Sequence, residues 1–198
     1  MQDNYLLQAR QAKARFLTYS QEEIIKRHGL KADDTYLYLT FFSLPYRISR
    51  KTGDLFRFAE GRWEAADSHG EVMTVLDLLC DSREDRHPAG TYRNMQDFGH
   101  QFHRSLGEEN PDARYFDSCP EKLKKACPAL GGVPFPQGDI AFRIPVFEDL
   151  SLVLQFWQGD EEFAPRLRYL WDSNALMYLK YETMYFAADV LVSRIRQF

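Results

Sequence analysis

The sequence predicts an α+β fold with a mostly antiparallel sheet that is built from hairpins and has helices packed on one face. Some segments repeat apolar residues at helical spacing, others alternate them as strands do, and the two kinds are mixed along the chain. The strict alternation of strand and helix that indicates a parallel sheet is absent. Because 198 residues, 44% of them hydrophobic, suffice for one core, we expect a single domain over residues 1–198. Residues 128–138, rich in proline and glycine, are the best candidate for a subdomain boundary.

The N-terminal part of the chain is predicted to be helical. Apolar residues recur at helical spacing over residues 6–16 and predict a first helix. Ser20 and Glu23 have the spacing of a capping box, in which the serine oxygen accepts the backbone N–H of the glutamate, so a second helix begins there. Gly29 is expected to end it, because glycine readily adopts the left-handed conformation found at helix C-termini.

A region of strands follows. Residues 35–42 are rich in aromatic and branched side chains and are apolar on both faces, which predicts a central strand. Pro45 is expected to interrupt or end this strand, since proline cannot donate a backbone hydrogen bond. Residues 46–49 and 55–58 flank the turn-forming residues 51–54 and predict a hairpin.

Three helices are predicted in the middle of the chain. Capping boxes open two of them, at Ser68 and at Ser118, and the glycine pair 131–132 ends the second. Between these two, an apolar stripe over residues 95–106 predicts an amphipathic helix that ends at Gly107.

The last third of the chain has the clearest pattern. Apolar and other residues alternate over residues 140–146 and 152–157, which predicts two strands joined by a short turn. Residues 166–171 are expected to add another strand. Apolar residues at helical spacing then predict a terminal helix over residues 182–196.

The charge of the chain argues against a polyanionic partner. Twenty-five basic and 29 acidic side chains give a net charge of −4 that is spread evenly, so we expect no nucleic-acid partner. Arg47, Arg50 and Lys51 form the one local basic cluster, which is more typical of a solvated hairpin tip. The longest stretch without a charge has 13 residues, whereas a membrane span needs about 20. The first residues lack the apolar core of a signal peptide, so we expect a cytoplasmic protein without a membrane partner.

An acidic turn is the first candidate for chemistry. Asp160, Glu161 and Glu162 directly follow the predicted strand that ends at Trp157. Adjacent carboxylates bind a hard cation through oxygen, or force one of their number to hold a proton and act as a general acid. The alternative is a solvated turn whose like charges face water. Asp172, at the end of the next predicted strand, is expected to cap a turn or to join the acidic group.

Two histidines are a further candidate. His100 and His103 are three residues apart and share one side of the predicted helix. A zinc site would need further ligands, which Cys119 or Cys127 could supply as thiolates. Ordinary half-exposed histidines are the alternative. The three cysteines include no C-x-x-C pair, which favours free thiols, and we expect neither a resident metal nor another cofactor.

Aromatic residues make up 15% of the chain. Most must belong to the core, because they fall at helical or strand spacing, but a surplus of tyrosines is also what a pocket for a flat or apolar ligand uses. The candidates for such a pocket are Tyr36, Tyr38, Tyr92, Tyr178 and Trp157.

The C-terminal half also carries a family resemblance. The segments GDIAFRIPVF at 138–147, LVLQFWQGDEEFAP at 152–165 and LWDS at 170–173 resemble the uncharacterised prokaryotic family known as domain of unknown function 3786. The W-x-G-D-E-E-F-x-P element and the following D-S are its most recognisable parts. The resemblance is strongest over residues 131–196 and extends over nearly the whole chain.

The resemblance implies a context but no catalytic residues. The family is found largely in anaerobes, and some members carry an N-terminal four-cysteine iron–sulfur segment like that of corrinoid iron–sulfur proteins. That segment is not among these residues, so the resemblance implies an accessory or ligand-binding role for this part.

We therefore expect a non-catalytic module that binds a small molecule or docks on a redox or metalloprotein partner in anaerobic metabolism. A hydrolase or transferase that uses the acidic turn, with or without a divalent metal, is the alternative, and whether the chain is an enzyme stays open. The candidate ligand-binding residues are Trp157, Asp160, Glu161, Glu162, Asp172, Tyr178 and Tyr92.

Overall fold

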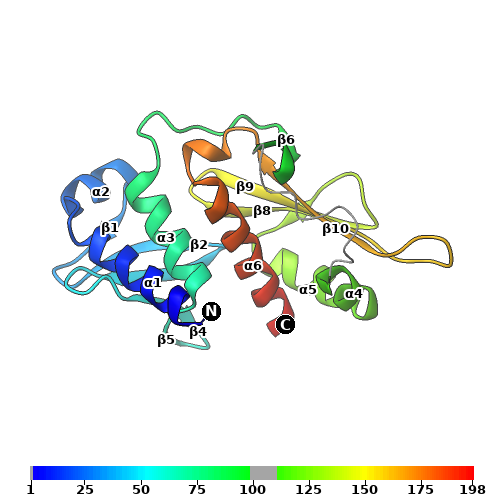
Figure 1. Cartoon of the computed structure of the whole chain (residues 1–198), viewed down its shortest axis with the longest axis horizontal. Helices are drawn as coiled ribbons and strands as arrows, with labels where there is room; N and C mark the ends of the chain where they lie inside the picture. Colours follow the sequence, from blue (N-terminus) through cyan, green and yellow to red (C-terminus); the bar gives the residue numbers. More distant parts are fainter. Residues whose placement is uncertain (1, 99–110) are drawn as a thin grey trace. The chain divides into compact units, whose positions relative to one another are not determined.

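The chain folds into two compact units, each with its own antiparallel sheet of five strands (Figure 1). The computed structural model describes residues 2–98 and 111–198, with side chains from Asn4 onward. The first unit comprises Met1–Arg86 and Met177–Val190, and the second comprises His87–Leu176 and Leu191–Phe198. The structure confirms the predicted α+β fold and the antiparallel pairing, but it divides the strands between two sheets. The predicted boundary at residues 128–138 lies inside the second unit, and the single domain stays a prediction.

The sheet of the first unit is a meander in which each strand pairs with the next. Its strands are β1 (Lys31–Ala32), β2 (Tyr36–Phe41), β3 (Leu44–Ser49), β4 (Leu55–Ala59) and β5 (Arg62–Ala65). The predicted hairpin between β3 and β4 is confirmed. The expectation for Pro45 was wrong: it lies within β3 opposite Thr40, because the chain already turns at Phe42 and Ser43.

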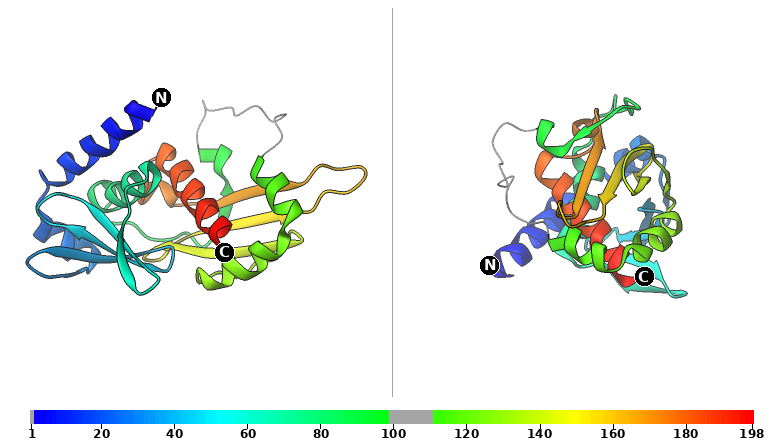
Figure 2. Two further views of the ribbon diagram at one scale, coloured as in Figure 1. Left: turned by 90° about the horizontal axis from the view of Figure 1, so that it is seen from below. Right: turned by 90° about the vertical axis from the view of Figure 1, so that its right-hand side faces the viewer.

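Helices cover one face of this sheet. The capping residues predicted from the sequence are confirmed: the Oγ atoms of Ser20 and Ser68 accept the backbone N–H groups of Glu23 and Glu71, both at 3.3 Å, and Gly29 is left-handed with φ 59°. The Tyr46 hydroxyl on β3 donates to the Glu71 carboxylate at 2.5 Å, which fixes α3 to the inner face. Figures 1 and 2 show α1 and α3 on one side of the sheet. The helices are α1 (Gln2–Phe16), α2 (Gln21–His28) and α3 (His69–Asp81).

The sheet of the second unit has the order β6-β10-β9-β8-β7. Its strands are β6 (Tyr92–Asn94), β7 (Val133–Pro134), β8 (Ile140–Phe147), β9 (Leu150–Trp157) and β10 (Arg166–Asp172). The three long central strands are those predicted from alternation, and the two short edge strands were not predicted. Arg143, Arg166 and Arg168 point to one side of this sheet, as the register shows; we call this side the arginine face. On the opposite side α5 packs on β8.

The helices of the second unit depart most from prediction. Ser118 is the last residue of α4 (Pro111–Ser118), and its hydroxyl donates to the Tyr115 carbonyl, so the expectation that it caps a helix was wrong. The next helix, α5 (Pro120–Ala129), begins after Cys119, whose side chain makes no capping bond. Of the helix predicted at 95–106, residues 95–98 form a single 3-10 turn, η1 (Met95–Phe98), and the rest lies outside the described residues.

The C-terminal helix is close to its predicted bounds. It runs from Tyr181 to Gln197 as α6, after the short 3-10 turn η2 (Ala175–Met177). Its residues up to Val190 group with the first unit and the remainder with the second. None of the helices within the described ranges combines the length and the apolar character that crossing a membrane requires.

Candidate functional site

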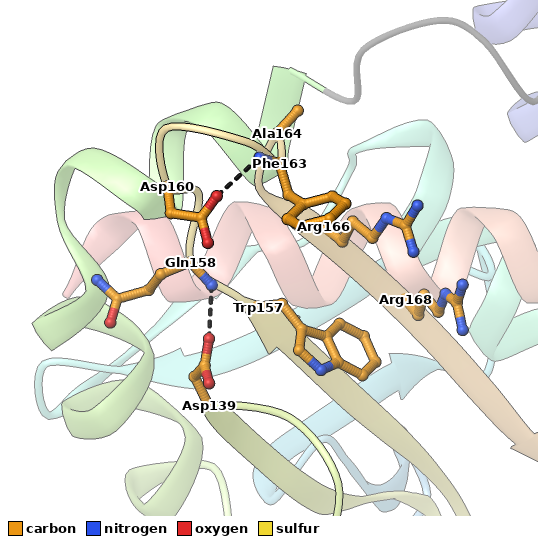
Figure 3. Close-up of a pocket in the computed structure, with 8 residues that line it drawn as sticks. All are labelled: Asp139, Trp157, Gln158, Asp160, Phe163, Ala164, Arg166 and Arg168. Atoms are coloured by element: carbon orange, nitrogen blue, oxygen red, sulfur yellow. Dashed lines mark hydrogen bonds between the residues drawn. The ribbon is translucent and has the colours of Figure 1, made fainter.

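A hollow of about 500 Å³ opens on the arginine face, where β9 turns into β10 (Figure 3). This volume lies within the usual range for small-molecule sites, about 300–1,000 Å³. Its wall combines two aromatic rings, two guanidinium groups and two carboxylates, contributed by Trp157, Phe163, Arg166, Arg168, Asp139 and Asp160.

The loop between the two strands is shaped by its own backbone contacts. Gly159 lies so close to Pro165 that a Cβ atom on the glycine would be 2.8 Å from the proline Cδ. Its N–H donates to the Asp117 carboxylate at 2.9 Å. The next residue, Asp160, accepts the N–H groups of Glu162 and Phe163 through Oδ1, at 2.9 and 2.7 Å. These bonds satisfy a tight turn and hold Phe163 at the rim of the hollow.

A second carboxylate anchors the floor of the hollow. Asp139, just before β8, donates its N–H to the Phe156 carbonyl at 2.9 Å. Its Oδ2 accepts the Gln158 N–H at 2.8 Å. Asp139 and Asp160 therefore each use one oxygen to hold backbone, and each keeps its second oxygen for another partner.

The aromatic and basic side chains come from neighbouring positions of the hairpin. Trp157 is directly opposite Arg166 in the register, and Arg168 follows two residues later on the same face. The Arg168 guanidinium carbon lies 5.4 Å from the centre of the Trp157 ring, a loose cation–π contact. Within residues 2–98 and 111–198, neither arginine has a carboxylate within ion-pair distance, and both are exposed.

Acidic and basic side chains lie on opposite sides of the hollow. Figure 3 shows the two carboxylates on one side of Trp157 and the two arginines on the other. The Phe163 ring, 64% exposed, offers a further apolar surface at the rim. This arrangement can hold a flat molecule that has hydrogen-bond donors at one end and negative charge at the other.

Comparison with known families identifies the chain. A family model described as Domain of unknown function (DUF3786) matches residues 20–194, most of the sequence. The chain belongs to the DUF3786 family. No curated protein and no solved structure matches it.

The acidic turn of this DUF3786 domain does not bring its carboxylates together. Glu161 and Glu162 are exposed and do not line the hollow, whereas Asp160 lines it and closes the turn. Asp172 lies at the other end of β10, about 20 Å along the strand from Arg166. The convergence that the carboxylate-dependent alternative requires is therefore not seen.

Asp172 instead holds a loop. It is 1% exposed and accepts three backbone N–H groups: those of Ala89 and Asn174 on Oδ1 at 2.8 Å each, and that of Gly90 on Oδ2 at 2.9 Å. This carboxylate caps the end of β10 and fastens the segment before β6 to it, as the capping alternative expected.

Neither of the two tyrosines of the DUF3786 domain that were predicted as ligand-binding lines the hollow at Trp157. Tyr92 is half-buried, with its hydroxyl 2.6 Å from the Ser151 Oγ and its ring 5.7 Å from that of Phe135. It lines a second hollow of about 480 Å³ on the arginine face, together with Arg143. Tyr178 is 1% exposed and belongs to the core of the first unit.

The described part of the chain shows no metal centre. Among residues 2–98 and 111–198, no three His, Cys, Asp or Glu side chains gather closely enough to hold a metal ion. His100 and His103 lie outside the described residues. Burial raises the pKa of Cys127 to about 12, so this thiol is protonated at neutral pH and is a poor ligand. The Cys119 thiol donates to the Tyr115 carbonyl at 3.1 Å.

Sequence reasoning found Trp157 and Asp160 but missed Asp139, Phe163 and the two arginines. The sequence does contain a signal for the arginines. They occupy alternate positions of β10 and therefore share one face, and pairing the two predicted strands across the short loop places that face beside Trp157. Asp139 and Phe163 carry no such signal, because their positions depend on how the loop closes.

Proposed function

We propose that this DUF3786 domain is a binding module whose second unit holds a small, flat, anionic molecule over Trp157. The observation that carries the proposal is the pair of exposed arginines beside a half-buried indole ring, at the edge of a hollow of suitable volume. Aromatic rings bind flat ligands by stacking, and guanidinium groups bind carboxylates or phosphates with two parallel hydrogen bonds. The proposal assigns no catalytic role.

The carboxylates narrow the ligand class. Asp139 and Asp160 each present one carboxylate oxygen without a hydrogen bond to any described residue, on the side of Trp157 away from the arginines. A heterocycle with N–H groups at one end and a carboxylate or phosphate at the other would satisfy both sides. Pterins with a glutamate tail, purine mononucleotides and flavin mononucleotide have this chemistry.

The loose contact between Arg168 and Trp157 leaves room for such a ligand. The guanidinium carbon is 5.4 Å from the ring centre, whereas that of Arg47 in the first unit stacks at 4.1 Å from the Tyr36 ring. Arg168 can therefore turn toward an anion without losing a close stacking contact. Docking on a redox or metalloprotein partner in anaerobic metabolism rests on the family resemblance and stays a prediction.

Isothermal titration calorimetry with the full chain tests the proposal. Folate, GMP and flavin mononucleotide serve as probes, and methylcobalamin and haemin extend the panel to larger macrocycles. We expect at least one probe to bind and Arg168→Gln to weaken it about tenfold, the effect of losing one charge-assisted contact.

Arg143→Gln is the matched control, because Arg143 is also exposed on the arginine face but lines the other hollow. It should change the affinity by less than about twofold. The proposal fails if no probe binds, or if the Arg166→Gln, Arg168→Gln double variant binds as tightly as the wild type. A loss confined to Arg143→Gln would overturn this site in favour of the hollow at Tyr92.

A further inference from the structure

The outward side of the first sheet carries an unusual set of side chains. Alternation along the strands places five aromatic residues and one arginine on the side opposite the helices, where a solvated sheet normally carries polar residues. We call this side the aromatic face; it comprises Tyr36, Tyr38, Arg47, Phe56, Phe58 and Trp63.

These rings form a connected surface across four strands. Tyr38, Arg47 and Phe56 are directly opposite one another on β2, β3 and β4. Trp63 on β5 lies 6.4 Å from the Tyr38 ring and 5.3 Å from the Phe58 ring, between ring centres. All these side chains are partly exposed, and Phe58 is 38% exposed. A contiguous aromatic surface of this kind marks an interaction site in soluble proteins.

Arg47 occupies the middle of the aromatic face. Its guanidinium carbon is 4.1 Å from the Tyr36 ring centre, 4.6 Å from that of Trp63 and 5.2 Å from that of Phe56. No carboxylate of the described residues lies within ion-pair distance of it, and its Nε has no hydrogen-bond partner. Because Nε is buried, the donors that this cation offers to a ligand are its terminal NH₂ groups, which make no hydrogen bond to the described residues.

The other polar atoms of the face are also mostly donors. Neither the indole N–H of Trp63 nor the hydroxyl of Tyr36 has a hydrogen-bond partner in the part of the chain that the structure describes. The Tyr38 hydroxyl donates to Asp33 at 2.7 Å, so the nearby acceptor is already engaged. A ligand that complements this face must be apolar, rich in acceptors and poor in donors.

We propose that the aromatic face binds a proline-rich segment of a partner protein in the polyproline II conformation. Proline has no backbone N–H, and the carbonyl groups of a polyproline II chain are not used internally, so they can accept from Arg47, Trp63 and Tyr36. The pyrrolidine rings can pack against the aromatic side chains of this face, which is how aromatic surfaces recognise such segments. Single-stranded nucleic acid fits less well, because the Asp33 carboxylate beside Tyr38 would repel phosphates.

Fluorescence anisotropy with a labelled decaproline peptide tests the inference on the full chain. A glycine/serine decamer and a labelled deoxythymidine decamer are titrated in parallel. We expect saturable binding of decaproline, at least about tenfold weaker binding of the glycine/serine peptide, and no comparable binding of the oligonucleotide.

Variants then locate the binding surface. Trp63→Phe removes one donor and keeps a ring, and Tyr36→Ala removes a ring; we expect losses of about threefold and about tenfold. Trp157→Phe, in the other unit, is the matched control and should leave decaproline affinity unchanged. Circular dichroism confirms that each variant is folded.

The inference is overturned if decaproline does not bind, if the glycine/serine peptide binds equally well, or if the oligonucleotide binds in its place. It is also overturned if Tyr36→Ala and Trp63→Phe, both folded, bind decaproline like the wild type. Loss of binding in Trp157→Phe would place the peptide in the second unit and refute the aromatic face as its site.

Discussion

Replacement of Asp172 separates a structural role from a ligand-binding one. The carboxylate is buried and accepts three backbone N–H groups, from Ala89, Gly90 and Asn174. Each hydrogen bond to a charged acceptor contributes about 1.5–3 kcal/mol, but the sum overstates the effect. Ala89 and Gly90 are exposed, so water can replace the lost acceptor there. We therefore expect Asp172→Ala to lower the free energy of unfolding by about 3 kcal/mol.

Asp172→Asn is the sharper variant, because it changes one atom. Its amide oxygen can still accept from Ala89 and Asn174, but its NH₂ group then faces the Gly90 N–H, so one bond is lost and two donors oppose each other. A loss of about 2 kcal/mol follows. For a chain of this length, this corresponds to a decrease in Tm of roughly 4–8 °C.

Urea unfolding followed by tryptophan fluorescence measures the effect, and calorimetry with the bound probe measures affinity on the same samples. Glu161→Gln, an exposed carboxylate of the predicted acidic site, is the control and should change stability by less than about 0.5 kcal/mol. The reasoning is refuted if Asp172→Asn leaves stability unchanged while probe affinity falls, since Asp172 would then belong to the binding site.

Three further outcomes are expected. The pKa of Asp81 lies below its usual range, because hydrogen bonds, above all from Arg15, outweigh the opposing effect of burial. Its stabilising contribution is therefore fully present above the unfolded-state pKa, near 3.8, and is lost progressively as the pH falls from there through the lower folded-state pKa; Asp81→Asn should lower the urea midpoint equally at pH 7 and pH 5, and by a steadily smaller amount as the pH falls below 3.8. Gly159→Ala should shift the loop, because its Cβ would be 2.8 Å from Pro165, and calorimetry should show at least about fivefold weaker probe binding with about 1–3 kcal/mol lost in unfolding. Cys127, buried and with its pKa raised to about 12, should resist iodoacetamide at pH 8 and react in urea, as peptide mass spectrometry can show.

Local signals in the sequence were sufficient where the structure is decided locally. The capping boxes at Ser20 and Ser68 form as expected, and Gly29 ends its helix, because each involves atoms within one helical turn. The residues at Ser118 match the same capping-box pattern, but Ser118 lies at the end of a preceding helix, where its hydroxyl donates to a carbonyl. The short edge strands β6 and β7 have too few residues to show an alternation and depend on their partners for pairing.

The turn between β2 and β3 shows how the core can override local preference. Phe42 and Ser43 both have positive φ, 47° and 60°, which a two-residue hairpin of this kind requires. Left-handed conformations cost non-glycine residues about 1–2 kcal/mol each, and for that reason such turns usually contain glycine or asparagine. Phe42 is fully buried, and burying a phenylalanine contributes about 1.5–3 kcal/mol, which offsets much of that cost. The sequence shows no turn signal here because tertiary packing stabilises the turn.

Only one short stretch of the candidate site, the end of β9 and the loop that follows it, was predictable from the sequence. Trp157 and Asp160 belong to a segment that is distinctive because it contains three adjacent carboxylates. In the structure these three carboxylates have different roles. Asp160 closes the turn and reaches the hollow, while Glu161 and Glu162 face solvent. Adjacent residues in a turn point in different directions, so a cluster of charges in the sequence need not form a cluster in space.

The same geometry explains the segment that carries the family resemblance. The glycine of W-x-G-D-E-E-F-x-P permits the close approach to the proline, the aspartate closes the turn, and the phenylalanine is held at the rim. These requirements are structural, and they fix the walls of the hollow. Other charged groups of the hollow come from other segments: Asp139 before β8, and Arg166 and Arg168 at alternate positions of β10. The loop therefore specifies the shape of the site, and the neighbouring strands specify its charge. Variants of the loop should lower both stability and ligand affinity. Variants of the arginines should lower ligand affinity and leave the fold intact.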